Sequence, residues 1–179
     1  DTFVSQASAG SNFNNGSPLY VLRNAAGQES HILLSFDSSG IPAGSTIVSA
    51  SLGLHPYYAM ALQAPEAPQA FSLMPEAILS PWNASTVTWN NVPGSASQGD
   101  PMTAWNEITW NWFDVTAIVQ GWSSGALVNY GIKIRPADST VGTAQYIAIP
   151  DSFRAHLIVV YGPEPCDAAT STTIGGATQ

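Results

Sequence analysis

Short runs of alternating apolar and polar residues, each closed by a turn signal, most restrict how this chain can fold. In the run at 46–54, Ala50, Leu52 and Leu54 fall on one face, with small or polar residues between them. A period of two is the pattern of a strand that is buried on one face. Roughly nine or ten such runs lie between clusters of Gly, Pro, Asn and Ser. We therefore predict an all-β fold, a jelly-roll β-sandwich with one short helix and an extended C-terminal tail.

The helix is predicted within the sequence TWNWFDVTAIVQGW at 109–122, where the period changes from that of a strand to that of a helix. Trp110 and Trp112 fall on the same face of the strand that opens this stretch. Asp114 is placed to act as the N-cap, because its carboxylate can accept from the free N–H groups of the first turn. Gly121 offers a C-terminal stop. We therefore predict a helix over 115–121 whose apolar face packs against the strands.

Two segments of the middle of the chain are less regular. Phe71 to Leu79 is strand-like but contains Pro75, which predicts an edge strand or a bulge. Residues 86–89 predict another short strand. The composition shows no domain boundary before Gly162, and two prolines follow it. We therefore predict one sandwich over 1–162 and a tail over 163–179.

Charge is scarce in this chain, at 9% of the residues, and the net charge is −8. Binding to a phosphate backbone needs a basic face, so four Lys and Arg residues argue against a nucleic-acid partner. No apolar run is long enough to span a membrane. The strand-like start at Asp1 predicts an extracellular or cell-surface protein after removal of a signal peptide. The single Cys166 is either a free thiol or a partner for another chain.

Four segments occur in the same order as in the disaggregatase-related (DNRLRE) family, and the chain resembles that family over about residues 1–162. The segments are DTFV at 1–4, HILLSFDSSGIPAGSTIVSASLGL at 31–54, STVTWNNVPG at 85–94, and FDVTAIVQGWSSG at 113–125 followed by NYGIKIR at 129–135. The family consists of extracellular β-sandwich modules that are grouped with carbohydrate-binding modules. The resemblance implies a jelly-roll fold, export from the cell, no catalysis and contact with glycans. His31 stands where the family often carries an Arg.

Catalytic and metal-binding patterns are weak in this sequence. The three histidines (His31, His55 and His156) lie outside any nucleophile motif, and spacing assigns no carboxylate pair to glycoside hydrolysis. We therefore predict that the protein is not an enzyme. No His or Cys cluster has zinc spacing, and no cofactor is predicted. A structural Ca²⁺ is left open, because jelly rolls often hold one through loop carboxylates. The loop carboxylates that could serve are Asp37, Asp138 and Asp151.

Sugar binding requires exposed aromatic faces with hydrogen-bonding groups at their edges. Among the six tryptophans, we expect Trp89 and Trp122 in the core, because one belongs to a family-like segment and the other to the helix face. The predicted carbohydrate-binding residues are the loop aromatics Trp82, Trp105, Tyr57 and Tyr58. Two sequons in predicted loops, at Asn15 and Asn83, are expected sites of N-glycosylation.

The C-terminal tail favours a role in assembly. Its uncharged, β-competent segment can add to an exposed sheet edge, either of its own sandwich or of a neighbouring subunit. The segment consists of Thr170, Ser171, Thr172, Thr173 and Ile174. Head-to-tail contacts that do not close generate filaments. We therefore predict a non-catalytic structural subunit of an extracellular filament, a homopolymer joined by β-strand exchange. The alternatives are a carbohydrate-binding module that uses loop aromatics, and a surface adhesin.

Overall fold

The computed structural model of the protein describes residues 1–14, 18–58, 70–105, 109–137, 142–146, 154–162 and 170–175. The strands in these ranges are β1 (Thr2–Ser5), β2 (Leu19–Arg23), β3 (Glu29–Leu34), β4 (Thr46–Leu54), β5 (Pro56–Tyr58), β6 (Ala70–Ile78), β7 (Ser95–Ser97), β8 (Met102–Trp105), β9 (Asn111–Asp114), β10 (Ile132–Pro136), β11 (Gly142–Tyr146), β12 (His156–Gly162) and β13 (Thr170–Gly175). The helices are η1 (Gln6–Ser8), η2 (Trp89–Asn91) and α1 (Thr116–Ser124). No helix among these is long and apolar enough to cross a membrane.

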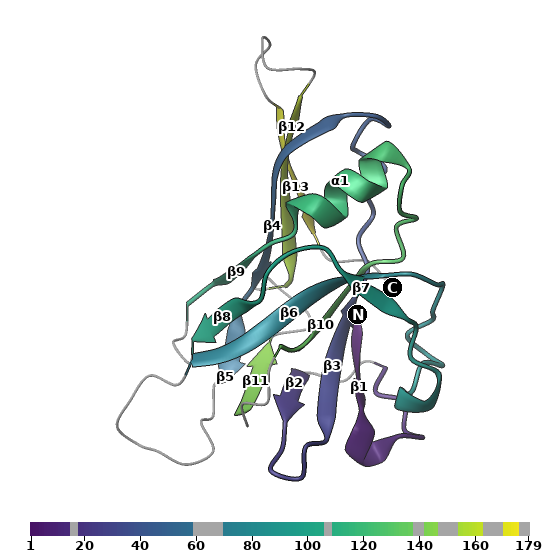
Figure 1. The fold of residues 1–179 in the computed structure, drawn as a ribbon, viewed down its shortest axis with the longest axis vertical. Helices are drawn as coiled ribbons and strands as arrows, with labels where there is room; N and C mark the ends of the chain where they lie inside the picture. The colour runs from purple at the N-terminus through teal and green to yellow at the C-terminus, as the bar shows by residue number, and fades with distance from the viewer. Residues whose placement is uncertain are drawn as a thin grey trace.

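The strands form two sheets, which confirms the predicted all-β sandwich (Figure 1). The larger sheet has nine strands in the order β5-β11-β2-β3-β10-β6-β7, with β1 paired to β3 and β8 paired to β6. The smaller sheet has four strands in the order β13-β12-β4-β9. Every described pairing is antiparallel. An antiparallel sheet packs one face against the core, and its other face can be open to solvent.

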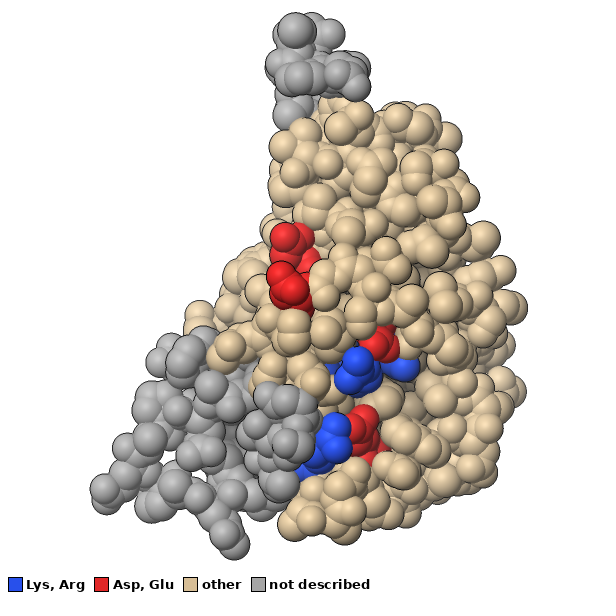
Figure 2. All heavy atoms as spheres, viewed as in Figure 1, with Lys and Arg blue, Asp and Glu red and all other residues tan. Residues whose placement is uncertain are grey.

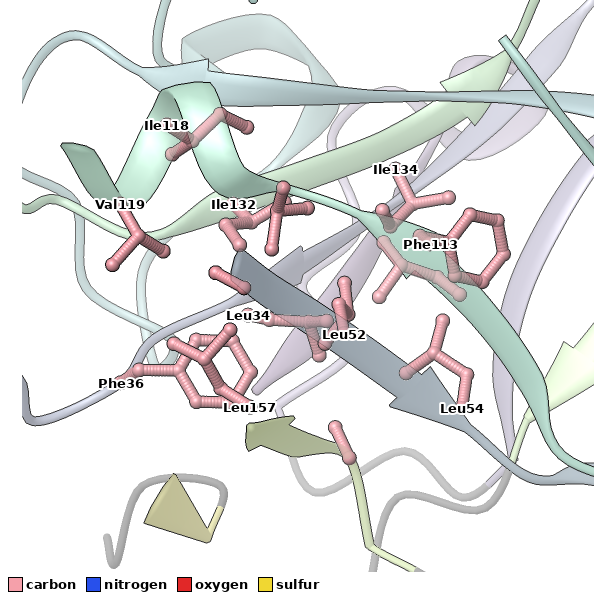
Figure 3. Close-up of a cluster of buried hydrophobic side chains, with 14 of the residues drawn as sticks. Leu34, Phe36, Leu52, Leu54, Phe113, Ile118, Val119, Ile132, Ile134 and Leu157 are labelled. Atoms are coloured by element: carbon pink, nitrogen blue, oxygen red, sulfur yellow. The ribbon is translucent and has the colours of Figure 1, made fainter. Parts of the chain in front are cut away.

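The main hydrophobic core lies between the two sheets (Figure 3). Leu34 and Ile132 reach it from the larger sheet, and Leu52, Phe113 and Leu157 reach it from the smaller one. None of these side chains is more than 1% exposed. The alternation read in the sequence of β4 is thereby confirmed, because its apolar face forms part of this core.

A second, smaller apolar cluster covers the other face of the larger sheet. Its buried members are Val4, Leu33, Ile78 and Val87. Trp82, Trp89, Val92 and Tyr130 pack against it while staying partly exposed. The loop between β6 and β7 therefore folds over the sheet, and β3 is buried on both faces.

The helix begins and ends later than the sequence predicts. It spans Thr116–Ser124, and the residue that ends it is Gly125, with φ of 76°, rather than Gly121. Gly121 lies inside the helix, where a β-carbon would come within 2.7 Å of the Leu127 side chain. Its small size is thus used for close packing. Asp114 accepts a hydrogen bond from the backbone N–H of Thr116 at 2.9 Å, from a position one residue before the N-cap.

One prediction for the middle of the chain was wrong, and one of the two alternatives given for another is excluded. Residues 86–88 form no strand and Trp89 begins η2, because the Asn91 side chain accepts from the backbone N–H of Thr88 at 2.6 Å and so competes with strand pairing. β6 is not an edge strand, since β10 pairs with one side of it and β7 and β8 with the other. Pro75 lies in the gap between the residues paired with β8 and those paired with β7.

The C-terminal segment predicted to exchange between subunits is a strand of its own sandwich. β13 pairs with β12 of the same chain, from Tyr161 opposite Thr170 to His156 opposite Gly175. This is the fold-back arrangement of the two that the sequence left open. The N-terminal strand β1 is likewise paired, with β3. The predictions for Asn15, Asp138, Asp151 and Cys166 concern residues outside the described ranges.

Charged side chains of opposite sign lie next to one another on the larger sheet (Figure 2). Arg23 forms an ion pair with Glu29, and Lys133 and Arg135 both pair with Glu76. Glu76 is only 5% exposed. The cations of these pairs are therefore neutralised within the fold, and most of the surface around them in this view is uncharged.

Candidate functional site

The most exposed tryptophan of the described residues lies on the outer face of the smaller sheet. Side chains alternate along β9, so Asn111 and Phe113 are buried while Trp112 and Asp114 face outward. Trp112 is 42% exposed, an unusually large fraction for a tryptophan that belongs to a strand. The strand therefore presents an aromatic side chain to solvent although a core is available behind it.

A glycine on the neighbouring strand makes room for this indole. Gly53 of β4 stands opposite Trp112 of β9 on one side and opposite His156 of β12 on the other. A β-carbon at position 53 would lie 2.6 Å from the Trp112 ring, which is closer than real contacts allow. Because Gly53 has no side chain, the indole of Trp112 can lie across the sheet over the backbone of β4.

Trp110 contacts the Trp112 ring and joins it to two histidine rings. The ring of Trp110 stacks on that of Trp112, with centroids 5.6 Å apart and planes inclined by 27°. Trp110 also contacts His156, at 5.1 Å between centroids, and His55, at 5.3 Å. We call the surface formed by Trp110, Trp112, His55, His156 and Gly53 the aromatic face. The sequence prediction that the first two share a side of the strand is confirmed.

Polar groups lie beside the aromatic face. Asp114 is exposed on the same side of β9 as Trp112 and stands opposite Ser51 of β4. Hydrogen bonds from the side chain and backbone of Thr116 hold the pKa of Asp114 below its usual range. The carboxylate is therefore ionised at neutral pH and can only accept hydrogen bonds, while the Ser51 hydroxyl can both donate and accept.

Of the four aromatic residues predicted to bind sugar from loops, Trp82 lies in a loop and the other three lie in strands. Trp82 is partly buried, packs on the smaller apolar cluster and donates its indole N–H to the Tyr130 carbonyl oxygen at 2.7 Å. Trp105 is in β8, and Tyr57 and Tyr58 are in β5; their side chains lie outside the described part of the structure.

The tryptophans expected in the core do pack there. Trp122 lies against the main core and Trp89 against the smaller cluster, although both stay partly exposed. Trp89 contacts the ring of His31, with centroids 4.7 Å apart. His31 is 7% exposed and hydrogen-bonded to Glu29 at 2.5 Å, so it is a structural histidine.

The described residues contain no group of three or more His, Cys, Asp and Glu side chains that could hold a metal ion. Of the three carboxylates considered for Ca²⁺, only Asp37 is described, and it accepts from the backbone N–H of Ser39 at 2.9 Å. Asn83 is exposed, and its side-chain oxygen accepts from the backbone and hydroxyl of Ser85. Glycosylation at Asn83 stays a prediction.

Comparison with known families gives a match that covers most of the sandwich. The model of carbohydrate-binding module family 96 matches residues 1–147, more than half of the chain. The chain therefore belongs to carbohydrate-binding module family 96. No curated protein matches it. The resemblance drawn from the sequence is thus confirmed at the level of a carbohydrate-binding module, and the narrower disaggregatase-related assignment stays a prediction.

Proposed function

We propose that this protein is a non-catalytic carbohydrate-binding module that holds a glycan chain on the aromatic face of the smaller sheet. The observation that supports the proposal most is the exposure of Trp112, 42% of its surface, over a glycine that leaves the indole room to lie across the strand. Carbohydrate-binding modules are binding domains without catalysis, and membership of family 96 makes this class the best supported one.

The chemistry of the aromatic face suits a pyranose ring. One face of a sugar ring presents C–H groups, which pack on an indole, while its hydroxyl groups point outward and need hydrogen-bonding partners at the edge. The Ser51 hydroxyl and the Asp114 carboxylate supply such partners beside Trp112. His156 extends the row to the next strand. A chain that lies across β9, β4 and β12 would therefore meet one stacking ring and several polar groups.

The aromatic face is also preorganised. The Trp112 ring is stacked on Trp110, which is itself in contact with His55 and His156. Side chains that already have a fixed rotamer lose little conformational entropy when a ligand binds, so more of the contact energy appears as affinity. This arrangement favours a binding surface over a set of mobile loop aromatics.

The filament role predicted from the sequence has less support than its alternative. Exchange between subunits needs a terminal strand that leaves its own sandwich, and β13 forms six pairs with β12 in the same chain. The family match also describes a binding module rather than a structural subunit. The carbohydrate-binding alternative is therefore the better interpretation, and we place the glycan chain on the aromatic face.

The test of this function is retention on polysaccharides. Gel electrophoresis through immobilised glucans, xylan and mannan, together with pull-down on cellulose and chitin, finds the polymer that retards the protein. On that polymer we expect Trp112→Ala to lower the association constant about 10-fold to 100-fold, because truncating a central aromatic residue removes about 1.4–3 kcal/mol of binding free energy. Retention of the variant at the level of the unchanged protein would contradict the proposal.

Two matched variants strengthen this experiment. Gly53→Ala keeps both tryptophans but places a methyl group where the Trp112 ring lies, so it should also weaken binding. Val128→Ala removes an apolar side chain that is 63% exposed but lies outside the aromatic face, and it should bind normally. Thermal unfolding of all three variants shows whether each is folded. If no polysaccharide retains the unchanged protein, the proposed function is wrong.

A further inference from the structure

A hollow of about 480 Å³ lies at a second place on the molecule, beside Trp82. It is formed by the start of β1, the end of β3, and the segments before η2 and before β10. Its volume falls within the ~300–1,000 Å³ range of small-ligand sites. A second hollow of about 380 Å³ shares Pro81, Trp82 and Asn83 with it. Pro81, Trp82 and Asn83 therefore line both hollows.

The indole of Trp82 is held rigidly at this wall. It packs against the smaller apolar cluster, and its N–H donates to the Tyr130 carbonyl oxygen at 2.7 Å. Trp82 is nevertheless not fully buried, so part of the ring remains open to the hollow that it lines. Phe36 lines the same hollow. A ligand would therefore meet fixed aromatic surface without having to order it.

Polar side chains around the hollow carry hydrogen-bonding groups that have no partner among the described residues. The Asn83 side-chain oxygen accepts from Ser85, at 2.8 Å from the backbone N–H and 2.6 Å from the hydroxyl, which leaves the amide N–H₂ without a partner in the described structure. The hydroxyl of Tyr130 and the side-chain amide of Asn14 likewise have no partner among the described residues. The Asp1 carboxylate is fixed by the backbone N–H of Ser35 at 3.1 Å.

The charge of the lining restricts the ligand. None of the side chains that line the hollow is that of a Lys or an Arg, Asp1 contributes the one carboxylate, and burial lowers the pKa of the α-amino group of Asp1 and so disfavours its positive charge. A ligand that carries phosphate, sulfate or carboxylate groups would be repelled or left unpaired there. A neutral ligand with many hydroxyl groups and one apolar face matches the amides, hydroxyls and aromatic rings that the hollow provides.

We propose that this hollow is a second binding site, which holds one or two neutral sugar residues of a short oligosaccharide or of a chain end. Trp82 supplies the stacking surface, and Tyr130 and the side-chain amide of Asn83, in protein that carries no glycan there, supply hydrogen bonds. The site shares no residue with the aromatic face, so it does not depend on the function proposed above. A bounded hollow takes a short segment, whereas the flat aromatic face takes an extended chain.

The test is a titration of the ¹⁵N-labelled protein with cellotetraose, mannotetraose and chitotetraose, followed by nuclear magnetic resonance. We expect at least one of these neutral probes to shift the indole N–H signal of Trp82 and the backbone signals of Asn83 and Ser85. Trigalacturonate, which carries carboxylates, should leave these signals unmoved. Shifts confined to Trp112 and its neighbours would overturn the second site and leave the proposed function intact.

Two substitutions each remove one hydrogen-bonding group and should leave the protein folded. Asn83→Asp keeps the oxygen that holds the Ser85 turn but replaces the N–H₂ donor, and Tyr130→Phe removes only a hydroxyl. Each should weaken binding of the active tetrasaccharide about 10-fold, the effect of one lost hydrogen bond to a sugar. Asn90→Asp adds the same charge at an exposed residue outside the hollow and should have no effect.

The two sites are distinguished by the pattern of results. Trp112→Ala should leave the shifts of Trp82 unchanged if the hollow binds sugar by itself. If Asn83→Asp and Tyr130→Phe both bind as tightly as the unchanged protein, or if none of the three tetrasaccharides shifts a signal of the hollow, the second site is refuted. Shifts at the hollow with no retention on any polysaccharide would support this inference while contradicting the function proposed for the aromatic face.

Discussion

Gly131→Ala should destabilise the protein by at least about 4 kcal/mol, a loss that approaches the whole stability of many domains. Gly131 precedes β10 and has φ of +100°, a backbone conformation that residues with a β-carbon rarely adopt. A β-carbon there would also lie 2.1 Å from the carbonyl oxygen of Leu34. The obstacle is backbone of β3, so it cannot rotate away as a flexible side chain could.

The surroundings of Gly131 leave little room for adjustment. Its carbonyl oxygen accepts from the backbone N–H of Ile78 at 3.0 Å, and its own N–H donates to Asn129 at 3.0 Å. Moving the residue to relieve the contact would break these bonds and shift Ile132, which pairs with both neighbouring strands. The strain therefore falls on the centre of the larger sheet.

Gly125→Ala provides the matched control for this experiment. Gly125 also has a positive φ, of 76°, but a β-carbon there would meet no atom within 4 Å. It should therefore cost only about 1 kcal/mol, the penalty of the left-handed conformation itself. Urea unfolding followed by tryptophan fluorescence measures both variants. Equal losses for the two glycines would show that the close approach to Leu34 is absent.

The sandwich could be predicted from the sequence because a strand with one buried face leaves a local signature. The alternation of 46–54 needed no knowledge of other strands, and it gave both the strand and its inward face correctly. A local hydrogen bond from a side chain to the backbone leaves no such alternation in the sequence. The turn around Thr88 depends on an asparagine side chain that competes with strand pairing, and β-branched residues nearby suggested the opposite.

The candidate site was predicted only in part, because it depends on pairing between strands that are distant in the sequence. The sequence placed Trp110 and Trp112 on one side of a strand, but it could not show that this side faces solvent. That result depends on which residue of β4 stands opposite Trp112 and which residue of β12 stands opposite that one, and both strands are far from β9 in the chain. An isolated glycine in a strand indicates close approach by another group, so Gly53 was the signal that could have drawn attention to Trp112.

The charged cluster around Glu76 on the larger sheet could not be predicted from the spacing of residues in the sequence. Glu76 of β6 stands opposite Lys133 of β10 and receives hydrogen bonds from Arg135 at 2.7 Å, from Ser97 at 3.2 Å, and from Ser95. Burial by itself would raise the pKa of Glu76, but the bonds from Ser95 and Arg135 and the nearby positive charges outweigh it and lower the pKa to about 2.

His31, on the strand next to β10, is shifted by a different cause. Burial disfavours its charged form and lowers its pKa to about 4, against the opposing effect of the hydrogen bond with Glu29. The folded protein therefore keeps His31 neutral at a pH where the unfolded chain would protonate it. As a result, His31 and Glu76 make the stability depend on pH in the same direction.

The free energy of unfolding should consequently fall in two stages as the pH is lowered. Between pH 6.5 and about 4 the unfolded chain takes up a proton at His31 that the folded protein does not, which reduces stability. Between pH 4.5 and about 2 the same holds for Glu76. Each stage should remove about 2 kcal/mol, because one pKa unit corresponds to roughly 1.4 kcal/mol and part of each shift is screened by solvent.

Glu76→Gln separates the second stage from the first. The variant should lose about 3 kcal/mol at pH 7, since Lys133 and Arg135 keep their charges in a partly buried place without the carboxylate. Its stability should then change less than that of the unchanged protein below pH 4.5. Asp100→Asn, which removes an exposed carboxylate, should leave the pH profile unaltered. Urea unfolding at a series of pH values measures all three proteins, and an equally steep acid loss in Glu76→Gln would mean that the ion cluster does not hold the fold.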